Sequence, residues 1–390
     1  MKTLRQALSL ALALSACTTG ATDPGDAGTS GRDAAAGDAG ALGNDAALPG
    51  HDADRPDAGF PDPTTSPVPM PWISEGVPAF ATSGDPLPAT DDVTTNCWAP
   101  SSLPASITYD ISGAHVDGPI YVAWYAIHAG AWLADAASAG DQFPTDYTIE
   151  IHTAPSSATP PTSGWTEIAS VTGNVHGSRG LLANAAGANW VRMTVTAASG
   201  GSTPCIDLDV HSAPQGASDA FLFMGDSITH MTFVYAFSDF RTRVRAGEPG
   251  RWPALFEAAI GGTNTGTALE VIDQTMADFD GRYVVLAYGT NDHANGFRMN
   301  ELIDHVLASG RIPIVPHMPW ASGSPEGEAI NAQIDAIYAA RPEVLRGPDL
   351  WAAFENRTDL IPVGDVHPND EGRNVLRQAW ADWLVSLPHP

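Results

Sequence analysis

Four residues in the second half of the chain could together carry out the hydrolysis of an ester. Ser227 follows Gly-Asp and offers a hydroxyl nucleophile, while His367, within Gly-Asp-Val-His-Pro, has the side chain whose pKa lies nearest neutrality, as a general base requires. Gly262 lets a backbone N–H approach a ligand closely, and Asn291 carries two uncharged amide N–H donors, so both suit an oxyanion hole. Each motif alone is also typical of an ordinary turn, but the four together predict nucleophilic catalysis through Ser227.

The segments between these residues indicate how they are positioned. Short continuous apolar runs, typical of strands buried on both faces, occur at Ala220–Met224, Tyr283–Tyr288 and Ile312–Val315. Helical patterns occur at Thr267–Phe279, Met299–Ala308, Gly327–Ala340 and Asp370–Leu387, the last with Asn369 or Asp370 as N-cap. Alternating strands and helices predict a parallel sheet with helices on both faces. Ligands of such sheets bind beyond the carboxyl ends of the strands, so we expect the four residues to meet there.

Residues 215–390 resemble the SGNH (GDSL-like) hydrolases, because Ser227, Gly262, Asn291 and His367 match, in order, the four residues that name the family. The resemblance implies a flavodoxin-like three-layer α/β/α fold and metal-free hydrolysis of esters. It also implies an oxyanion hole made of the backbone N–H groups of Ser227 and Gly262 and the side-chain amide of Asn291.

The chain departs from the family pattern in two motifs. The family usually places an acid three residues before the histidine, where this chain has Gly364, and Asp365 stands two residues before it instead. Either Asp365 orients His367, or a backbone carbonyl or a more distant acid does, leaving a Ser–His dyad. The second motif has Glu257 where the family usually has Asn, and Ala259 where Gly is common.

Residues 71–214 have a different pattern. Period-two alternation, typical of short strands, occurs at Ile107–Ile111, Tyr147–Ile151, Trp165–Val171 and Trp190–Val195, and predicts an all-β jelly-roll or sandwich domain. This part of the chain resembles the discoidin-like, galactose-binding-fold modules of carbohydrate-active enzymes. The resembling segments are Gly76–Ser83, Asp91-Asp92 followed by Trp98, Ile107–Ile111, and Trp165–Ile168 with Asn174. This resemblance implies glycan binding by residues 71–214. Trp98, Trp124 and Tyr125 could stack on sugar faces, but such residues more often belong to a hydrophobic core. The alternative is a domain that only packs against the catalytic domain and shields it.

The N-terminus is typical of an export signal. Lys2 and Arg5 precede Ala7–Ala16, an apolar run too short to span a bilayer. Leu-Ser-Ala-Cys17 resembles the lipobox of bacterial lipoproteins, which implies a signal peptide at residues 1–17 and a lipid on Cys17; an ordinary cleaved signal is the alternative. Residues 18–70, rich in Asp, Ala, Gly and Pro, predict a disordered linker. We therefore expect an exported protein, anchored by lipid in a bacterial cell envelope at the outer membrane, or extracellular.

Cysteine usage and charge narrow the remaining choices. Cys97 and Cys205 form an even pair, either a disulfide, as an oxidising compartment favours, or two buried thiols. The net charge of −27 disfavours nucleic acid and anionic lipid headgroups as partners, so any membrane contact is expected only through the lipid anchor. No Cys/His cluster has zinc-ligand spacing, and no metal or other cofactor is expected.

The sequence thus predicts a serine esterase that acts on an acylated carbohydrate or another neutral ester. Short acyl groups such as acetyl are the first expectation, because no apolar insertion near the four motifs is long enough to form a lid over a fatty chain. An envelope lipase, lysophospholipase or thioesterase is the competing enzyme. A glycan-binding surface adhesin is the alternative without catalysis.

Overall fold

The computed structural model describes residues 66–91, 93, 96–126, 142–201, 203–233 and 236–388. The predictions for the signal peptide, for Cys17 and for the linker up to residue 65 lie outside these residues. The described residues belong to one compact unit, which contains both an all-β part and an α/β part. Among the described helices, none has the length and apolar character needed to cross a bilayer.

The α/β part is built on a parallel sheet of five strands. The strands are β9 (Ala220–Gly225), β10 (Ala254–Glu257), β11 (Tyr283–Ala287), β12 (Ile312–His317) and β13 (Leu345–Asp349). Their order is β10-β9-β11-β12-β13, and every neighbouring pair is parallel. Numbered along the chain this is the order 2-1-3-4-5 of flavodoxin-like sheets, so the predicted fold class is confirmed.

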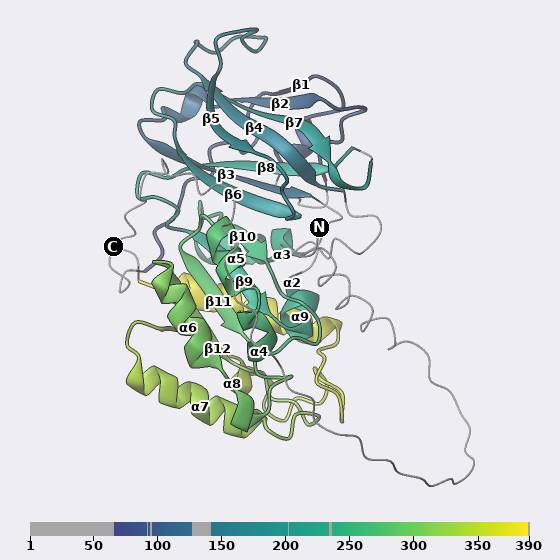
Figure 1. Cartoon of the computed structure of the whole chain (residues 1–390), viewed down its shortest axis with the longest axis vertical. Helices are drawn as coiled ribbons and strands as arrows, with labels where there is room; N and C mark the ends of the chain where they lie inside the picture. Colours follow the sequence, from purple (N-terminus) through teal and green to yellow (C-terminus); the bar gives the residue numbers. More distant parts are fainter. Residues whose placement is uncertain are drawn as a thin grey trace, which may run out of the picture. The chain divides into compact units, whose positions relative to one another are not determined.

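Helices cover both faces of this sheet (Figure 1). They are α2 (Ser227–Phe233), α3 (Phe237–Gly247), α4 (Thr265–Leu269), α5 (Ile272–Asp278), α6 (Met299–Ala308), α7 (Gly327–Ala340), α8 (Leu350–Phe354) and α9 (Asp370–Ser386). The single helix expected over Thr267–Phe279 is divided into α4 and α5, because the backbone of Val271 is not helical and instead begins α5. α4 also begins two residues earlier than expected, since Asn264 caps it.

Alternate residues of the central strand separate the two helical layers. Phe221 and Phe223 of β9 pack in a cluster with residues of α2, α3 and α9. Leu222 and Met224 pack in another cluster with residues of α5, α6 and α7. A strand buried on both faces has to be apolar at every position, which is the pattern that identified β9 in the sequence.

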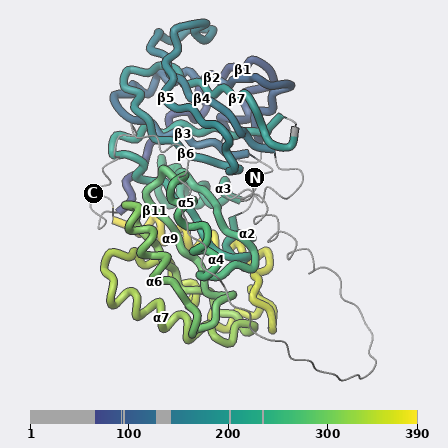
Figure 2. Tube along the Cα trace, viewed as in Figure 1, coloured from purple at the N-terminus to yellow at the C-terminus, as the bar shows by residue number. Residues whose placement is uncertain are grey.

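The last helix returns to the first. Asn369 caps α9 by accepting a hydrogen bond from the backbone N–H of Gly372 at 2.9 Å, as one of the two predicted caps requires. α9, near the C-terminus, contacts α2 and α3 at the start of the α/β part (Figure 2). The fold thus brings the residues that precede α9 close to those that begin α2.

The all-β part is a sandwich of two antiparallel sheets, as predicted (Figure 1). The larger sheet has the order β1-β2-β7-β4-β5, with β1 (Ala79–Ala81), β2 (Ala105–Asp110), β7 (Trp190–Ala198), β4 (Pro144–His152) and β5 (Thr166–Val171). The smaller sheet has the order β6-β3-β8, with β6 (Ser178–Asn184), β3 (Pro119–Ala126) and β8 (Ile206–Ser212). Side chains from both sheets form one apolar cluster between them. Cys97 and Cys205 form a disulfide, which confirms the first of the two alternatives for this pair.

The smaller sheet is apolar on both faces along β3. Ile120, Val122 and Trp124 belong to the core of the sandwich. Tyr121 and Tyr125, on the other face, belong to the core cluster that contains α5 and α6. The two parts of the compact unit therefore share this second cluster, which is their shared core.

Three aromatic residues considered as sugar platforms are buried. Trp98 and Trp124 are 0 % exposed, and Tyr125 is 7 % exposed. Trp98 donates its indole N–H to the carbonyl of Ser83 at 2.7 Å, and Trp124 packs edge-on against Tyr147. None of the three presents a free ring face, so of the two interpretations the structure supports the hydrophobic core and not the sugar platform.

The packed chain begins before the predicted domain boundary at Pro71. The N–H of Val68 donates to the carbonyl of Ser218 at 3.2 Å, and the Ser218 hydroxyl donates to the carbonyl of Val68 at 2.8 Å. Met70 is 1 % exposed and lies in the shared core. These residues tie the start of the sandwich to the start of β9.

Candidate active site

Ser227 stands at the point where β9 ends and α2 begins. Gly225 is required before it, because a Cβ there would overlap the Thr229 hydroxyl and lie 2.8 Å from the carbonyl oxygen of Ala287. The Asp226 carboxylate accepts a hydrogen bond from the backbone N–H of Ile228 at 2.9 Å, which fixes the first turn of the helix. The tight turn leaves Ser227 partly exposed at the carboxyl edge of the sheet.

His367 meets Ser227 although 140 residues separate them. The Ser227 Oγ lies 2.9 Å from the His367 Nε2. Asn369 fixes the loop that carries His367: its N–H donates to the carbonyl of Leu360 at 2.9 Å, and its side-chain amide donates to the carbonyl of Asp359 at 2.7 Å. The cap of α9 is thus also the anchor of the histidine loop.

Asp365 lies against the other ring nitrogen of His367. Its Oδ1 is 3.1 Å from Nδ1, and the same oxygen accepts the backbone N–H groups of Val366 at 2.7 Å and His367 at 3.0 Å. The hydrogen bond from the His367 N–H is the main cause that lowers the pKa of Asp365, so this carboxyl is ionised at neutral pH. Gly364, with a φ of +81°, allows the turn from Pro362 to Asp365 that brings the acid to this position.

The loops after β10 and β11 are joined to each other beside Ser227. Gly262 has a φ of +77°, and a Cβ on the preceding Gly261 would lie 3.7 Å from the Ser227 Cβ. The side-chain amide of Asn291 donates to the carbonyl of Thr263 at 2.9 Å, which uses one of its two N–H donors. Within the described residues, the structure assigns no acceptor to the backbone N–H groups of Ser227 and Gly262.

Asp292 is a second link between these loops, and the sequence analysis did not identify it. Its buried carboxylate accepts the backbone N–H of Thr265 at 3.1 Å and also the Thr265 hydroxyl. The same hydroxyl accepts the backbone N–H of Arg298 at 2.9 Å. Burial raises the pKa of Asp292. The sequence shows an acidic residue directly after Asn291. Its contact with the start of α4, however, depends on the order of the strands in the sheet.

Two further titratable groups lie close to the nucleophile and were not assigned a role from the sequence. His230, one turn after Ser227 on α2, has its Nδ1 3.3 Å from Oε1 of Glu257. Glu257 is 2 % exposed and ends β10, and the same oxygen accepts the backbone N–H of Ala259 at 2.8 Å. The unusual acid of the second motif therefore has a partner on the nucleophile helix.

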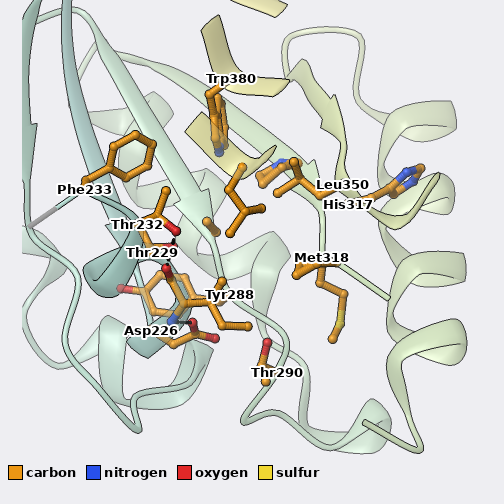
Figure 3. A pocket seen from close by; sticks show the side chains of 15 residues that line it. Asp226, Thr229, Thr232, Phe233, Tyr288, Thr290, His317, Met318, Leu350 and Trp380 are labelled. Atoms are coloured by element: carbon orange, nitrogen blue, oxygen red, sulfur yellow. Dashed lines mark hydrogen bonds between the residues drawn. The ribbon is translucent and has the colours of Figure 1, made fainter. Parts of the chain in front are cut away.

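A narrow, mostly apolar pocket lies on the α2 side of the sheet (Figure 3). Asp226 and Thr290 lie toward one end of it and Trp380 toward the other (Figure 3). Burial raises the pKa of Asp226 to about 6. The lining includes neither Ser227 nor His367, although Asp226 and Ile228, on either side of the serine, belong to it. In the described part of the chain, His, Cys, Asp and Glu side chains form no group of three that could hold a metal ion.

Comparison with known families agrees with this arrangement. Residues 223–375 match the model of the GDSL-like Lipase/Acylhydrolase family. This segment is a GDSL-like domain. It begins within β9, ends within α9, and includes Ser227, Gly262, Asn291, Asp365 and His367. The GDSL-like domain belongs to a class of ester-hydrolysing enzymes. No curated relative matches the chain.

Solved structures resemble the two parts separately. The psychrotrophic esterase EstA from Pseudoalteromonas sp. is 18% identical, over 43% of this chain and 96% of that protein, with a TM-score of 0.35. A catalytic mutant of Axe2, an acetylxylan esterase from Geobacillus stearothermophilus, is 15% identical over 44% of this chain and 96% of that protein, with a TM-score of 0.36. The chitosan-binding module 1 of a chitosanase/glucanase from Paenibacillus sp. IK-5 is 18% identical over 36% of this chain and 97% of the module, with a TM-score of 0.27.

Proposed function

We propose that this protein is a serine esterase in which Ser227 is the nucleophile and His367 the general base. The observation that carries the proposal is the chain of contacts from Ser227 Oγ to His367 Nε2 at 2.9 Å and from His367 Nδ1 to Asp365 at 3.1 Å. An ionised carboxylate at Nδ1 holds the imidazole with its proton on that nitrogen, so Nε2 is free to accept the serine proton.

The reaction follows from this arrangement. His367 removes the proton of Ser227 as Oγ attacks the ester carbonyl, and a tetrahedral intermediate forms. The backbone N–H groups of Ser227 and Gly262 and the remaining amide N–H of Asn291 stabilise the oxyanion. His367 then gives its proton to the leaving alcohol, and water hydrolyses the acyl-enzyme by the same route. Asp365 orients the imidazole and stabilises its protonated form.

We further propose that the substrate is a neutral ester, with short acyl groups on carbohydrate as the first choice. A chain with a net charge of −27 repels phosphate-bearing lipids and nucleic acids, whereas a sugar ester meets no such barrier. Hydrolysis of nitrophenyl acetate, octanoate and palmitate tests both proposals. Wild type should prefer acetate, Ser227→Ala should lose activity, and Ser386→Ala, which alters an exposed serine, should keep it. Preference for the long chains would favour a lipase, and no hydrolysis at all would contradict the esterase.

Glycan binding by the sandwich is a separate proposal. Because the sandwich shares a core with the α/β part, the test uses the full chain with Ser227→Ala, so that binding is measured without hydrolysis. Affinity electrophoresis in gels containing xylan or chitosan should retard this variant relative to a gel without polysaccharide. Equal mobility in all gels would favour a domain that only supports the catalytic part.

Lipid anchoring through Cys17 is the last part of the proposal and is supported by the lipobox-like sequence. When the full-length gene is expressed in a bacterium supplied with labelled palmitate, the wild-type protein should carry label and appear in the envelope fraction. Cys17→Ser should carry none. Label-free wild type in the medium would indicate an ordinary cleaved signal instead.

A further inference from the structure

The accessible side of α2 carries a second functional group beside the nucleophile. Ser227 and His230 are three residues apart on this helix, so they lie on one face with Cβ atoms about 5–6 Å apart. The other two side chains of the first turn, Ile228 and Thr229, are buried. The side chain of His230 is 38 % exposed. The imidazole is therefore within reach of a substrate held at Ser227.

Glu257 fixes the orientation of this imidazole. The carboxyl side chain is 1 % exposed and contacts Nδ1 of His230 at 3.3 Å. It also holds the backbone N–H of Ala259, at the start of the loop that carries Gly261 and Gly262. The hydrogen bond to the buried carboxyl raises the pKa of His230, and burial raises the pKa of Glu257. With Nδ1 committed to Glu257, the ring has Nε2 left to bind a ligand, and in the described residues no partner is assigned to this atom.

We propose that His230 determines specificity through a hydrogen bond between its Nε2 and a hydroxyl group on the alcohol part of the ester. The enzyme then favours esters of polyols, in which a free hydroxyl neighbours the acylated one, over esters of alcohols without that hydroxyl. This inference rests on the proposed esterase function. A hydroxyl is the fitting partner because it accepts from the protonated ring and donates to the neutral one, so the contact persists in both states of His230.

The test compares two substrates that differ by one hydroxyl. One is a mono-O-acetylated methyl xyloside with a free hydroxyl beside the ester, and the other is the deoxy compound that lacks it. In the wild type, kcat/KM should be about tenfold higher for the hydroxyl-bearing compound, the effect expected for one hydrogen bond to a charged donor. His230→Ala should remove this preference through KM, with kcat/KM for the deoxy compound and for nitrophenyl acetate changed less than about twofold.

Two matched variants separate binding from a structural role. His230→Gln keeps an N–H donor near the position of Nε2 and should restore most of the preference. His293→Ala removes another exposed histidine that contacts a carboxylate, Glu326, at 2.9 Å, and should leave the preference intact. An equal loss on both xylosides in His230→Ala, or a wild type without preference, would overturn the role of His230. The esterase itself fails only if the wild type cleaves no acetate, or if Ser227→Ala cleaves nitrophenyl acetate as fast as the wild type does.

Discussion

Arg241 of α3 is the cation of a buried polar cluster between the two parts of the compact unit, and its replacement should destabilise the protein strongly. The cluster consists of Arg241 with Asp207, Asp209 and His211, which occupy alternate positions of β8. Arg241 is 0 % exposed; its Nη1 lies 3.5 Å from Oδ2 of Asp209, and its guanidinium stacks 4.6 Å from the ring centre of Tyr125. Arg241→Met keeps most of the volume and removes the charge.

The expected loss follows from what the substitution leaves behind. Asp209 is 1 % exposed, and among the described residues Arg241 is the only cation with which it forms an ion pair. The substitution would remove that partner. Breaking a buried pair in this way costs about 3–5 kcal/mol, and the lost cation–π contact adds about 1 kcal/mol. With about 2–4 °C per kcal/mol, the conversion for domains of about 150–250 residues, Tm should fall by about 8–24 °C.

The loss should also depend on pH. Burial raises the pKa of Asp209 to about 6, and the charge of Arg241 opposes this rise. A carboxyl whose folded pKa exceeds its unfolded value stabilises the fold at low pH, and this contribution is lost as pH rises from about 4 through the folded pKa. Without Arg241 the pKa of Asp209 in the folded state rises further, so the variant continues to lose stability as the pH rises above 6. The substitution should therefore lower the free energy of unfolding more at pH 8 than at pH 5.

Thermal unfolding followed by circular dichroism at both pH values is the assay. Arg243→Met is the matched control, because Arg243 lies two residues further along α3, is 25 % exposed and pairs with Asp239 at the surface. A drop in Tm for Arg241→Met no larger than that of the control, or one that does not grow with pH, would refute the argument. Adding Asp209→Asn to Arg241→Met should recover part of the loss.

Three further predictions concern the site and the disulfide. Asn291→Ala should lower kcat by about 10²–10³ with KM little changed, in steady-state assays with nitrophenyl acetate, because one oxyanion donor is lost. Asp365→Asn should lower kcat more than tenfold, since its carboxylate contacts Nδ1 of His367; a smaller loss in the same assay would indicate a Ser–His dyad. Replacing Cys97 and Cys205 together by serine opens a loop spanning 108 residues and should cost about 3–5 kcal/mol, seen as a lower urea midpoint; an unchanged midpoint would contradict this.

The meeting of Ser227 and His367 could be expected from the sequence because it depends on few physical rules. Apolar runs identify strands buried on both faces, and parallel strands place their following loops at one edge of the sheet. A motif after the first strand and another before the last helix are then brought together by topology alone. Distances were beyond this reasoning. Whether Asp365 reaches Nδ1 depends on the positive φ of Gly364, which a motif does not specify.

Pairs that depend on strand neighbours could not be found in the same way. Glu257 contacts His230 because β10 lies directly beside β9, in parallel register. In the sequence β10 is only four residues long, too short to give a distinct period, and it was not among the predicted strands. The two-helix structure of α4 and α5 was missed for a related reason, since apolar residues continue in helical spacing across the non-helical Val271.

The buried cluster on β8 shows that an alternating pattern must be interpreted together with the neighbouring strand. Asp207, Asp209 and His211 alternate with apolar residues, a pattern that on its own indicates a solvent face. β3 contradicts that interpretation, because it is apolar at every position from Ile120 to Ala126 and is hydrogen-bonded to β8 along its length. Since β3 is buried on both faces, other parts of the protein must pack against both of its faces. They also pack against the neighbouring strand β8. The polar residues of β8 therefore lie inside the protein, where the charge of Arg241 stabilises them. Deleting the sandwich would expose the residues of the α/β part that pack against β3 and β8.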